Sequence, residues 1–314
     1  MSFRVAVTDH VFTDLEIERD ALRAIGATLD EYSCSSVEEI IDQVKDADAL
    51  LNCYAIVSEK AIVSLEKCKI IARYGIGIDT IALEAARKRN IYVTNVPDYC
   101  VDEVSDHAFA LLLASARKLI PLNATVQSGE WTFHNQRPMF RLRGQTLGFM
   151  GFGKIARLLK EKAAPFGFTF VAYDPFLSAS MDPSVELVDL PELFKRSDFL
   201  SLHTPLTSET RGMVDRSLFA LMKPTAVIVN TARGPVINEA DLVQALREKQ
   251  IGGAALDVLQ AEAISKDHPL LGLENVIITP HTAFYSEEAT VEQRTKAVQQ
   301  IIKALRNERP NYLV

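Results

Sequence analysis

Three side chains that could bind an organic acid and move a proton lie in the C-terminal half of the chain: Arg233, Glu262 and His281. A planar guanidinium binds a carboxylate through two parallel hydrogen bonds, which fixes the orientation of a 2-oxo acid. A histidine can donate a proton to a keto oxygen and accept it in the reverse direction. A carboxylate beside that histidine favours its protonated form and holds its ring. Together these residues predict acid–base chemistry on a small 2-oxo or 2-hydroxy acid.

Each of the three residues also has a structural interpretation. Arg233 could pair with an acid at the surface, Glu262 could be solvated in a loop, and His281 could be a hydrogen-bonded core histidine. Their shared position favours catalysis, because each follows a predicted strand, and open α/β sheets bind ligands at the carboxyl ends of strands. These strands are expected at Ala226–Asn230, Ala254–Val258 and Val276–Thr279. The remaining histidines lack this context, so we expect structural roles for His10, His107, His134 and His268, and for His203 as a residue that orders the loop beside Thr204.

A glycine-rich turn follows the apolar strand predicted at Thr146–Met150. Its sequence, Gly151-Phe152-Gly153-Lys154-Ile155-Ala156, is a GxGxxA variant of the dinucleotide-binding turn and opens a helix. The first two glycines permit a tight turn and let backbone N–H groups approach a pyrophosphate, and the helix N-terminus adds partial positive charge. A structural glycine turn is the alternative.

Asp174 favours the dinucleotide interpretation. It ends the predicted strand Thr169–Tyr173 and comes 21 residues after Gly153, where a carboxylate can accept hydrogen bonds from ribose hydroxyls. The same charge repels a 2′-phosphate, and no arginine follows at positions 175–177. The sequence therefore favours NAD over NADP as the cofactor. The alternative is an Asp-Pro pair that caps a helix.

Strand-like apolar segments alternate with helical patterns along the whole chain, which predicts an α/β fold with two Rossmann-like, doubly wound parallel sheets. The first group of strands is expected at Arg4–Thr8, Ala27–Tyr32, Ala49–Asn52, Ile70–Arg73 and Tyr92–Asn95. The second group has six, namely the five given above and Phe199–His203. Helices are expected at Val37–Lys45, Leu83–Arg89, Val101–Leu119 and Ser286–Arg306. Within the last but one of these, the stretch Ala108–Ala114 is apolar on every side, which fits burial against either a second subunit or the interdomain core.

Composition narrows the class of protein. The 314 residues carry a net charge of −7 without a basic cluster, so we expect no nucleic-acid partner. The four cysteines show neither a CxxC pair nor zinc-ligand spacing, so we expect reduced thiols and no metal. The sequence shows no secretory signal, and its longest apolar segment in the middle, Ala108–Ala114, is too short to span a bilayer. We therefore expect a soluble, cytoplasmic enzyme without a membrane partner.

At these motifs the chain resembles the D-isomer-specific 2-hydroxyacid dehydrogenase family over nearly its whole length. The segments that carry the resemblance are Gly151–Ala156, Val229-Asn230-Thr231-Ala232-Arg233-Gly234, Ala255-Leu256-Asp257-Val258 with Glu262, and Thr279-Pro280-His281-Thr282-Ala283. The resemblance implies that Arg233 binds the substrate carboxylate, Glu262 supports the histidine, and His281 is the acid and base.

The same resemblance implies two sets of binding residues. The cofactor set comprises Ile76, Gly151, Gly153, Lys154, Ile155, Asp174, Thr204, Thr231, Ala232, Arg233, Asp257, His281 and Ala283. The substrate set comprises Tyr74, Gly75, Ile76, Gly77, Arg233, His281 and Phe284. Within it, Tyr74-Gly75-Ile76-Gly77-Ile78-Asp79 matches the family's substrate loop, whose backbone N–H groups hold the carboxylate. A plain strand-to-helix turn is the alternative for that loop.

The family also implies a discontinuous substrate domain, residues 1–98 with 286–314, and an inserted NAD-binding domain, residues 99–285. The crossings near Asp98 and Tyr285 would act as hinges whose closure excludes water. A homodimer is expected. The segments Asn95–Cys100 and His281–Glu287 are most similar to the C-terminal-binding-protein-like branch, which contains both enzymes and corepressors. Ala263 departs from the family pattern, which has proline after the catalytic glutamate.

Three functions fit these expectations. The leading one is NADH-dependent reduction of a small 2-oxo acid such as hydroxypyruvate or glyoxylate. The second is D-3-phosphoglycerate dehydrogenase, because Arg73 stands where that enzyme has one phosphate-facing arginine. Against it, Asn52-Cys53-Tyr54 lacks the second arginine, and we expect no regulatory domain after Val314. The third, from another class, is an NADH-sensing corepressor-like binding protein. Such a protein usually carries long disordered extensions, which we do not expect here.

Overall fold

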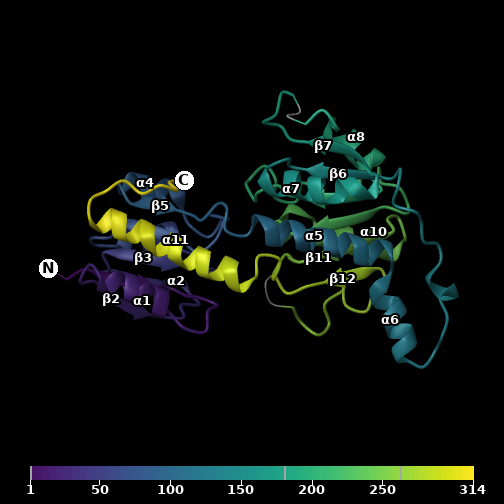
Figure 1. The fold of residues 1–314 in the computed structure, drawn as a ribbon. Helices are drawn as coiled ribbons and strands as arrows, with labels where there is room; N and C mark the ends of the chain where they lie inside the picture. The colour runs from purple at the N-terminus through teal and green to yellow at the C-terminus, as the bar shows by residue number, and fades with distance from the viewer. Residues whose placement is uncertain (1, 180–181, 262–263) are drawn as a thin grey trace. The chain divides into compact units, whose positions relative to one another are not determined.

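The computed structural model describes residues 2–179, 182–261 and 264–314, so Glu262 and Ala263 lie outside the described residues. The chain forms two compact units, one of residues 1–99 with 286–314 and one of residues 100–285 (Figure 1). Each unit is built on its own parallel sheet. The predicted fold class, two parallel-sheet α/β domains, is confirmed.

The first unit has a five-stranded parallel sheet in the order β2-β1-β3-β4-β5. Its strands are β1 (Arg4–Val7), β2 (Thr28–Glu31), β3 (Ala49–Asn52), β4 (Ile70–Arg73) and β5 (Tyr92–Thr94). Its helices are α1 (Glu16–Arg23), α2 (Val37–Val44), α3 (Glu59–Ser64), α4 (Leu83–Lys88) and α11 (Glu287–Leu305). Alternate strand residues point to opposite faces. One face packs against α2, α3 and α4 through Ile40, Ile62 and Ile71, and α1 and α11 lie together on the other.

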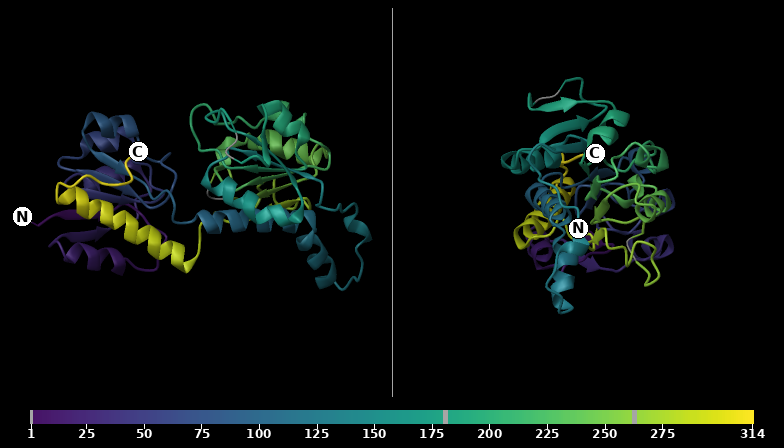
Figure 2. Two further views of the ribbon diagram at one scale, coloured as in Figure 1. Left: turned by 45° about the horizontal axis from the view of Figure 1, so that its top comes forward. Right: turned by 90° about the vertical axis from the view of Figure 1, so that its right-hand side faces the viewer.

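The second unit has a seven-stranded parallel sheet in the order β12-β11-β10-β9-β6-β7-β8. Its strands are β6 (Thr146–Met150), β7 (Thr169–Tyr173), β8 (Val185–Leu187), β9 (Phe199–Leu202), β10 (Val227–Asn230), β11 (Gly253–Leu256) and β12 (Val276–Ile278). Helices α5 (Val101–Ala116) and α7 (Lys154–Ala163) pack on one face of this sheet (Figure 2). Leu112 of α5 and Leu159 of α7 share a core cluster with Phe149 of β6. The other face packs against α8 (Leu190–Arg196), α9 (Arg216–Phe219) and α10 (Glu239–Arg247).

The prediction of six strands in this unit was one short, because β8 was missed. β8 has three residues, Val185-Glu186-Leu187, and pairs only with β7 at the edge of the sheet. A strand of this length carries too few alternating side chains to give a periodic signal. The strand order places β6 inside the sheet, with β7 and β8 on one side and β9 to β12 on the other, which is a doubly wound arrangement.

Helix α5 buries one face, including Val104, Ala108 and Leu112, and leaves other apolar side chains partly exposed. The predicted helix Val101–Leu119 ends close to the observed end of α5, but the helix that follows, α6 (Leu119–Gln127), was not predicted. Lys118 takes a left-handed conformation between the two, with φ of 50°, and ends α5. Among the described residues no single helix is long and apolar enough to cross a membrane. Helices α5 and α6, which are bent by 59° relative to each other, could cross one together by length and composition alone.

Candidate active site

Six parallel strands of the second unit end in register at one edge of its sheet. Hydrogen-bond pairing matches Met150 with Tyr173 and with Leu202, and continues through Asn230 and Leu256 to Ile278. Because all six strands run parallel, the residues that follow these six positions emerge at the same edge. They are Gly151, Asp174, His203, Thr231, Asp257 and Thr279. The sheet therefore brings the glycine turn, the acidic residue and the loops of Arg233 and His281 together.

The two glycines of the turn have different physical requirements. Gly151 has φ of +84°, and a Cβ there would lie 3.0 Å from the carbonyl oxygen of His203, so only glycine fits without strain. At Gly153 a Cβ would meet nothing within 4 Å. Gly153 also precedes α7, whose first N–H groups have no partner within the helix. Open space beside free N–H groups is what a pyrophosphate requires.

Asp174 ties the glycine turn to the end of β7. Its Oδ2 accepts a hydrogen bond from the N–H of Phe152 at 2.9 Å, and its Oδ1 accepts one from Phe176 at 3.0 Å. A carboxylate oxygen has a second lone pair, so both oxygens keep the capacity to accept from ribose hydroxyls. Asp174 therefore sets the shape of the turn as well as its charge.

Asn230 shapes the loop that carries Arg233. The Asn230 side chain is fully buried; its Oδ1 accepts from the N–H of Ala232 and its Nδ2 donates to the carbonyl of Arg233, both at 3.0 Å. The Arg233 guanidinium donates to the carbonyl of Ala232 at 2.8 Å. A Cβ at Gly234 would lie 1.8 Å from the carbonyl oxygen of Leu259, so the chain passes too close there for any other residue.

A buried hydroxyl in the same loop lacks a partner. The Oγ1 atom of Thr231 is shielded from solvent and makes no hydrogen bond within the part of the chain that the structure describes. An unsatisfied buried hydroxyl costs free energy, so its presence at this edge points to a bound group that forms a hydrogen bond with it. Together with the space at Gly153, this hydroxyl fits a dinucleotide.

The loop of His281 is organised by Asp257. The carboxylate of Asp257, 1% exposed, accepts from the hydroxyl of Thr279 at 2.6 Å and from the N–H groups of Thr282 and Ala283, each at 2.9 Å. Its backbone carbonyl accepts from the N–H of His281 at 2.8 Å. His281 takes a left-handed conformation, with φ of +52°. Such a conformation is rare for residues other than glycine and persists where surrounding contacts enforce it.

His107 on α5 extends this network, which the sequence did not reveal. Its Nε2 lies 2.9 Å from the Thr279 hydroxyl and 3.5 Å from Oδ1 of Asp257. Because that hydroxyl donates to Asp257, it accepts from His107, which places a proton on Nε2 of the imidazole. His107 and Thr279 are 172 residues apart, so no spacing pattern could have linked them.

The other predicted residues of this unit lie at the same edge. Thr204 donates to the carbonyl of Met150 at 3.0 Å, and the ring of Phe284 stands edge-on to that of His281, with centroids 6.1 Å apart. Ala283 is buried. The predicted role of Glu262 falls outside the described residues. No group of three or more His, Cys, Asp or Glu side chains suitable for a metal ion occurs among the residues described.

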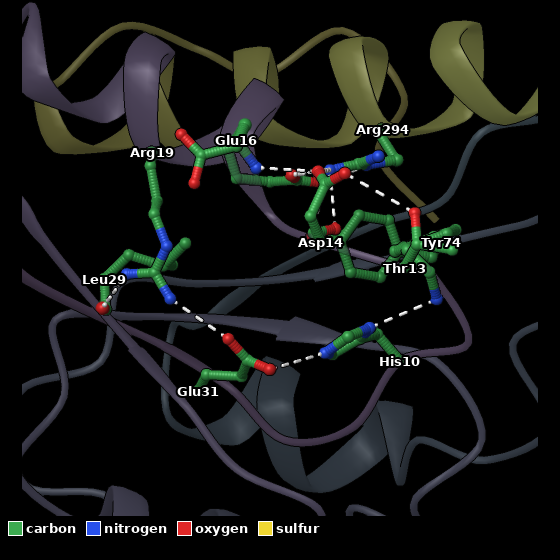
Figure 3. Close-up of polar contacts among 11 residues, drawn as sticks. His10, Thr13, Asp14, Glu16, Arg19, Leu29, Glu31, Tyr74 and Arg294 are labelled. Carbon is green, nitrogen blue, oxygen red and sulfur yellow. Dashed lines mark hydrogen bonds and ion pairs between the residues drawn. The ribbon is translucent and has the colours of Figure 1, made fainter.

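The predicted substrate loop lies in the first unit, after β4. Gly75 has φ of +127°, its carbonyl accepts from the N–H of Val96 at 2.9 Å, and the carbonyl of Ile76 accepts from Asn95 at 2.8 Å. Within the described ranges, the N–H groups of Gly75, Ile76 and Gly77 donate to no other group. Consecutive free backbone donors of this kind can bind an anion. The side chain of Tyr74 points away, into the core, where its hydroxyl donates to Glu18 (Figure 3), so only the backbone at this position can serve a substrate.

Arg73 lies directly beside these N–H groups. It is 7% exposed, and within the described chain its guanidinium makes no hydrogen bond or ion pair, with Nε shielded from solvent. A Cβ at Gly75 would collide with Nη1, which shows how closely the guanidinium approaches the loop. Burying an unpaired positive charge costs free energy unless an anionic ligand pairs with it.

Comparisons with known proteins agree with this geometry. Residues 109–283 match the model of the D-isomer specific 2-hydroxyacid dehydrogenase NAD binding domain. The chain is 42% identical to a D-3-phosphoglycerate dehydrogenase of Methanocaldococcus jannaschii over 86% of its own length, but it spans only 52% of that relative. It is 38% identical to a glyoxylate reductase of Korarchaeum cryptofilum, covering 89% of this chain and 86% of that one.

The fold of this chain is also similar to that of a solved structure. The D-lactate dehydrogenase of Aquifex aeolicus, in complex with NAD and lactic acid, superposes with a TM-score of 0.88 at 27% identity, covering 97% of this chain and 96% of that one. The family model covers more than half of the chain, and the glyoxylate reductase aligns over most of both lengths. The chain belongs to the D-isomer-specific 2-hydroxyacid dehydrogenase family.

Proposed function

We propose that this protein reduces small 2-oxo acids to D-2-hydroxy acids with NADH. The observation that carries the proposal is the in-register edge of the second sheet, where the glycine turn, the Arg233 loop and the clamped His281 loop emerge together. Membership of the family and the names of the relatives, glyoxylate reductase and D-lactate dehydrogenase, support the same reaction.

Each residue has a defined part in the proposed reaction. Arg233 binds the substrate carboxylate through its guanidinium, and the N–H groups of Gly75–Gly77 donate hydrogen bonds to the same carboxylate. His281 holds a proton on its imidazole and passes it to the keto oxygen as C2 becomes tetrahedral; in the reverse direction it takes the hydroxyl proton. Glu262 is proposed to support the imidazole. The clamp by Asp257 fixes where that imidazole stands.

The proposed cofactor is NAD. When bound, NADH supplies the hydride that the keto carbon takes up. The pyrophosphate would be held at Gly151, Gly153, Lys154 and Ile155, the ribose by Asp174, and the remaining contacts would come from Ile76, Thr204, Thr231, Ala232, Arg233, Asp257, His281 and Ala283. The unpaired Oγ1 of Thr231 and the open space at Gly153 support this arrangement.

For the substrate, we propose an acid of the size of glyoxylate or hydroxypyruvate. Arg73 supports a second candidate, D-3-phosphoglycerate dehydrogenation, because its unpaired guanidinium could form an ion pair with a phosphate. A phosphate dianion would need more than one positive charge, and Asn52-Cys53-Tyr54 supplies none. An NADH-sensing binding protein would have neither activity.

The test is NADH oxidation, followed by absorbance, with glyoxylate, hydroxypyruvate, pyruvate and 3-phosphohydroxypyruvate. We expect turnover with the unphosphorylated acids, and a loss of roughly 10²–10⁴ in kcat for His281→Gln if this residue is the general acid. A preference for 3-phosphohydroxypyruvate that falls about tenfold or more in Arg73→Gln would favour the second candidate, because tenfold is the effect of about 1.4 kcal/mol. No turnover with any acid would favour the binding protein.

We also propose a homodimer formed through α6 and the segment after it. Leu119, Ile120 and Val126 of α6 are exposed, and so are Trp131, at 91%, and Phe133. In Figure 1 this segment stands away from the sheet of its own unit. A second copy carries the same apolar surface and can cover it symmetrically. Sedimentation of the wild type and of Ile120→Glu tests this: we expect a dimer that dissociates in the variant, and a monomeric wild type would contradict it.

A further inference from the structure

A buried polar network lies behind the free N–H groups of Gly75–Gly77. It begins at Tyr74, the residue before them, whose side chain is 1% exposed. Its hydroxyl donates to Oε1 of Glu18 on α1 at 3.0 Å (Figure 3). Burial and then the charge of Glu18 raise the pKa of Tyr74 well above its ordinary value, so the hydroxyl stays protonated and remains a donor.

Glu18 is in turn held by Arg294 of α11. The carboxylate of Glu18 is 0% exposed and accepts from Nε of Arg294 at 3.0 Å and from Nη2 at 2.8 Å. The same Nη2 donates to the carbonyl of Asp14 at 2.8 Å and to its carboxylate at 3.1 Å. The network therefore ties three segments that are far apart in the sequence: the start of α1, the loop after β4, and α11.

Aromatic packing closes the network from one side. The guanidinium carbon of Arg294 lies 4.9 Å from the ring centre of Phe12. The Phe12 ring stands edge-on to that of Tyr74, with centroids 5.0 Å apart. Both contacts favour one placement of the two side chains. Tyr74 is thus fixed at its hydroxyl and at its ring.

The free energy of burying these charges indicates that the network fixes the position of Tyr74. A buried ion pair is often no more stabilising than well-packed apolar residues of the same volume, because both charges lose their hydration. The apolar alternative would not define a single position for Tyr74, whereas hydrogen bonds of fixed direction do. The backbone of the same segment is anchored as well: the N–H of Tyr74 donates to the carbonyl of Asn52 at 2.7 Å, and that of Val96 to the carbonyl of Gly75 at 2.9 Å.

We propose that Tyr74, Glu18 and Arg294 are positioning residues, which hold the Gly75–Gly77 loop so that its N–H groups meet the carboxylate of the substrate. The inference rests on the proposed function for what the loop binds, and on the network alone for how the loop is held. Nothing in the network touches the reacting atoms. Its loss should therefore weaken the binding of the acid and leave the chemical step intact.

The first test reads the position of the loop without any substrate. Tyr74→Phe removes only the hydroxyl, and Tyr92→Phe, at an exposed position of the same sheet, is the matched control. We expect hydrogen–deuterium exchange of the amides at positions 74 and 96 to accelerate roughly three- to tenfold in Tyr74→Phe, as the loss of one net hydrogen bond predicts. Exchange that matches the control would overturn the inference whether or not any acid is reduced.

The second test separates binding from chemistry. In Tyr74→Phe we expect the KM for hydroxypyruvate to rise roughly three- to tenfold, while kcat and the Kd for NADH stay within about twofold. A variant with a lower Tm but an unchanged KM would show a merely structural role and overturn the inference. If the wild type reduces no 2-oxo acid, the proposed function fails, and amide exchange alone decides whether the network holds the loop.

Discussion

Asp257 holds His281 by its backbone while its carboxylate holds the two residues that follow. The carbonyl of Asp257 accepts the N–H of His281 at 2.8 Å, and the carboxylate accepts those of Thr282 and Ala283. His281 sits between these contacts at φ of +52°. The rare backbone conformation of the proposed acid and base is therefore enforced by a residue on the neighbouring strand end.

Asp257→Asn tests this clamp. The amide nitrogen of asparagine cannot accept a hydrogen bond, so at least one of the bonds to Thr279, Thr282 and Ala283 is lost. We expect kcat to fall roughly 10- to 100-fold, as for other displaced catalytic groups, with Asp267→Asn, at an exposed position, as the control. Wild-type kcat in Asp257→Asn would show that the carboxylate does not position His281.

Arg233→Ala tests carboxylate binding. We expect the KM for 2-oxo acids to rise by roughly 10²-fold or more, since a charge-assisted pair in a desolvated site contributes about 2–5 kcal/mol, and the Kd for NADH to rise by a smaller factor. Arg216→Ala is the matched control, because that guanidinium is exposed and already pairs with Asp241. Equal kinetics of the two variants would remove Arg233 from the proposed mechanism.

Substitution of the two glycines of the turn by alanine should have different effects on stability and on cofactor binding. Gly151→Ala places a Cβ 3.0 Å from a carbonyl oxygen at a positive φ, so we expect it to lower the free energy of unfolding by about 1–3 kcal/mol. Gly153→Ala places a Cβ in open space, so we expect wild-type stability but NADH binding at least about tenfold weaker. Thermal unfolding and NADH fluorescence titration measure both effects. Tight NADH binding by Gly153→Ala would argue against a pyrophosphate at this turn.

His203 gives a prediction on pH. Desolvation lowers the pKa of His203 to about 4, so the folded protein keeps the ring neutral where the unfolded chain, with a pKa near 6.5, already binds a proton. The free energy of unfolding should therefore fall as the pH drops from about 6.5 to 4, by about 3 kcal/mol at most from this residue. Urea unfolding at pH 7 and pH 4.5 should show a smaller fall for His203→Gln. An equal fall in both proteins would contradict the prediction.

Much of the fold could be predicted from the sequence, because local signals marked the elements. Apolar segments located eleven of the twelve strands that the structure describes, and the family resemblance is confirmed. The three-residue strand β8 and the helix α6 were missed. At Lys118 the left-handed conformation ends the helix, and lysine carries no signal for that conformation.

The candidate site was predicted only in part, because local motifs name single residues and not the contacts between them. Motifs named Gly151, Arg233 and His281, but no motif shows that Asp257, Thr279 and His107 form one network, because these contacts join distant segments. The side chain of Tyr74 likewise turns into the core toward Glu18, which its place in a substrate loop did not indicate. The role of Glu262, the division of roles between the two domains, and the similarity to the C-terminal-binding-protein-like branch stay predictions.

The configuration of the product tests the central claim most directly. Hydroxypyruvate reduced by the wild-type protein with NADH should give D-glycerate, which chiral chromatography separates from the L form. We expect D-glycerate in an amount equal to the NADH consumed, and almost none from His281→Gln over the same time. Formation of L-glycerate, or of no glycerate with this or any other 2-oxo acid of the panel, would contradict the proposed function.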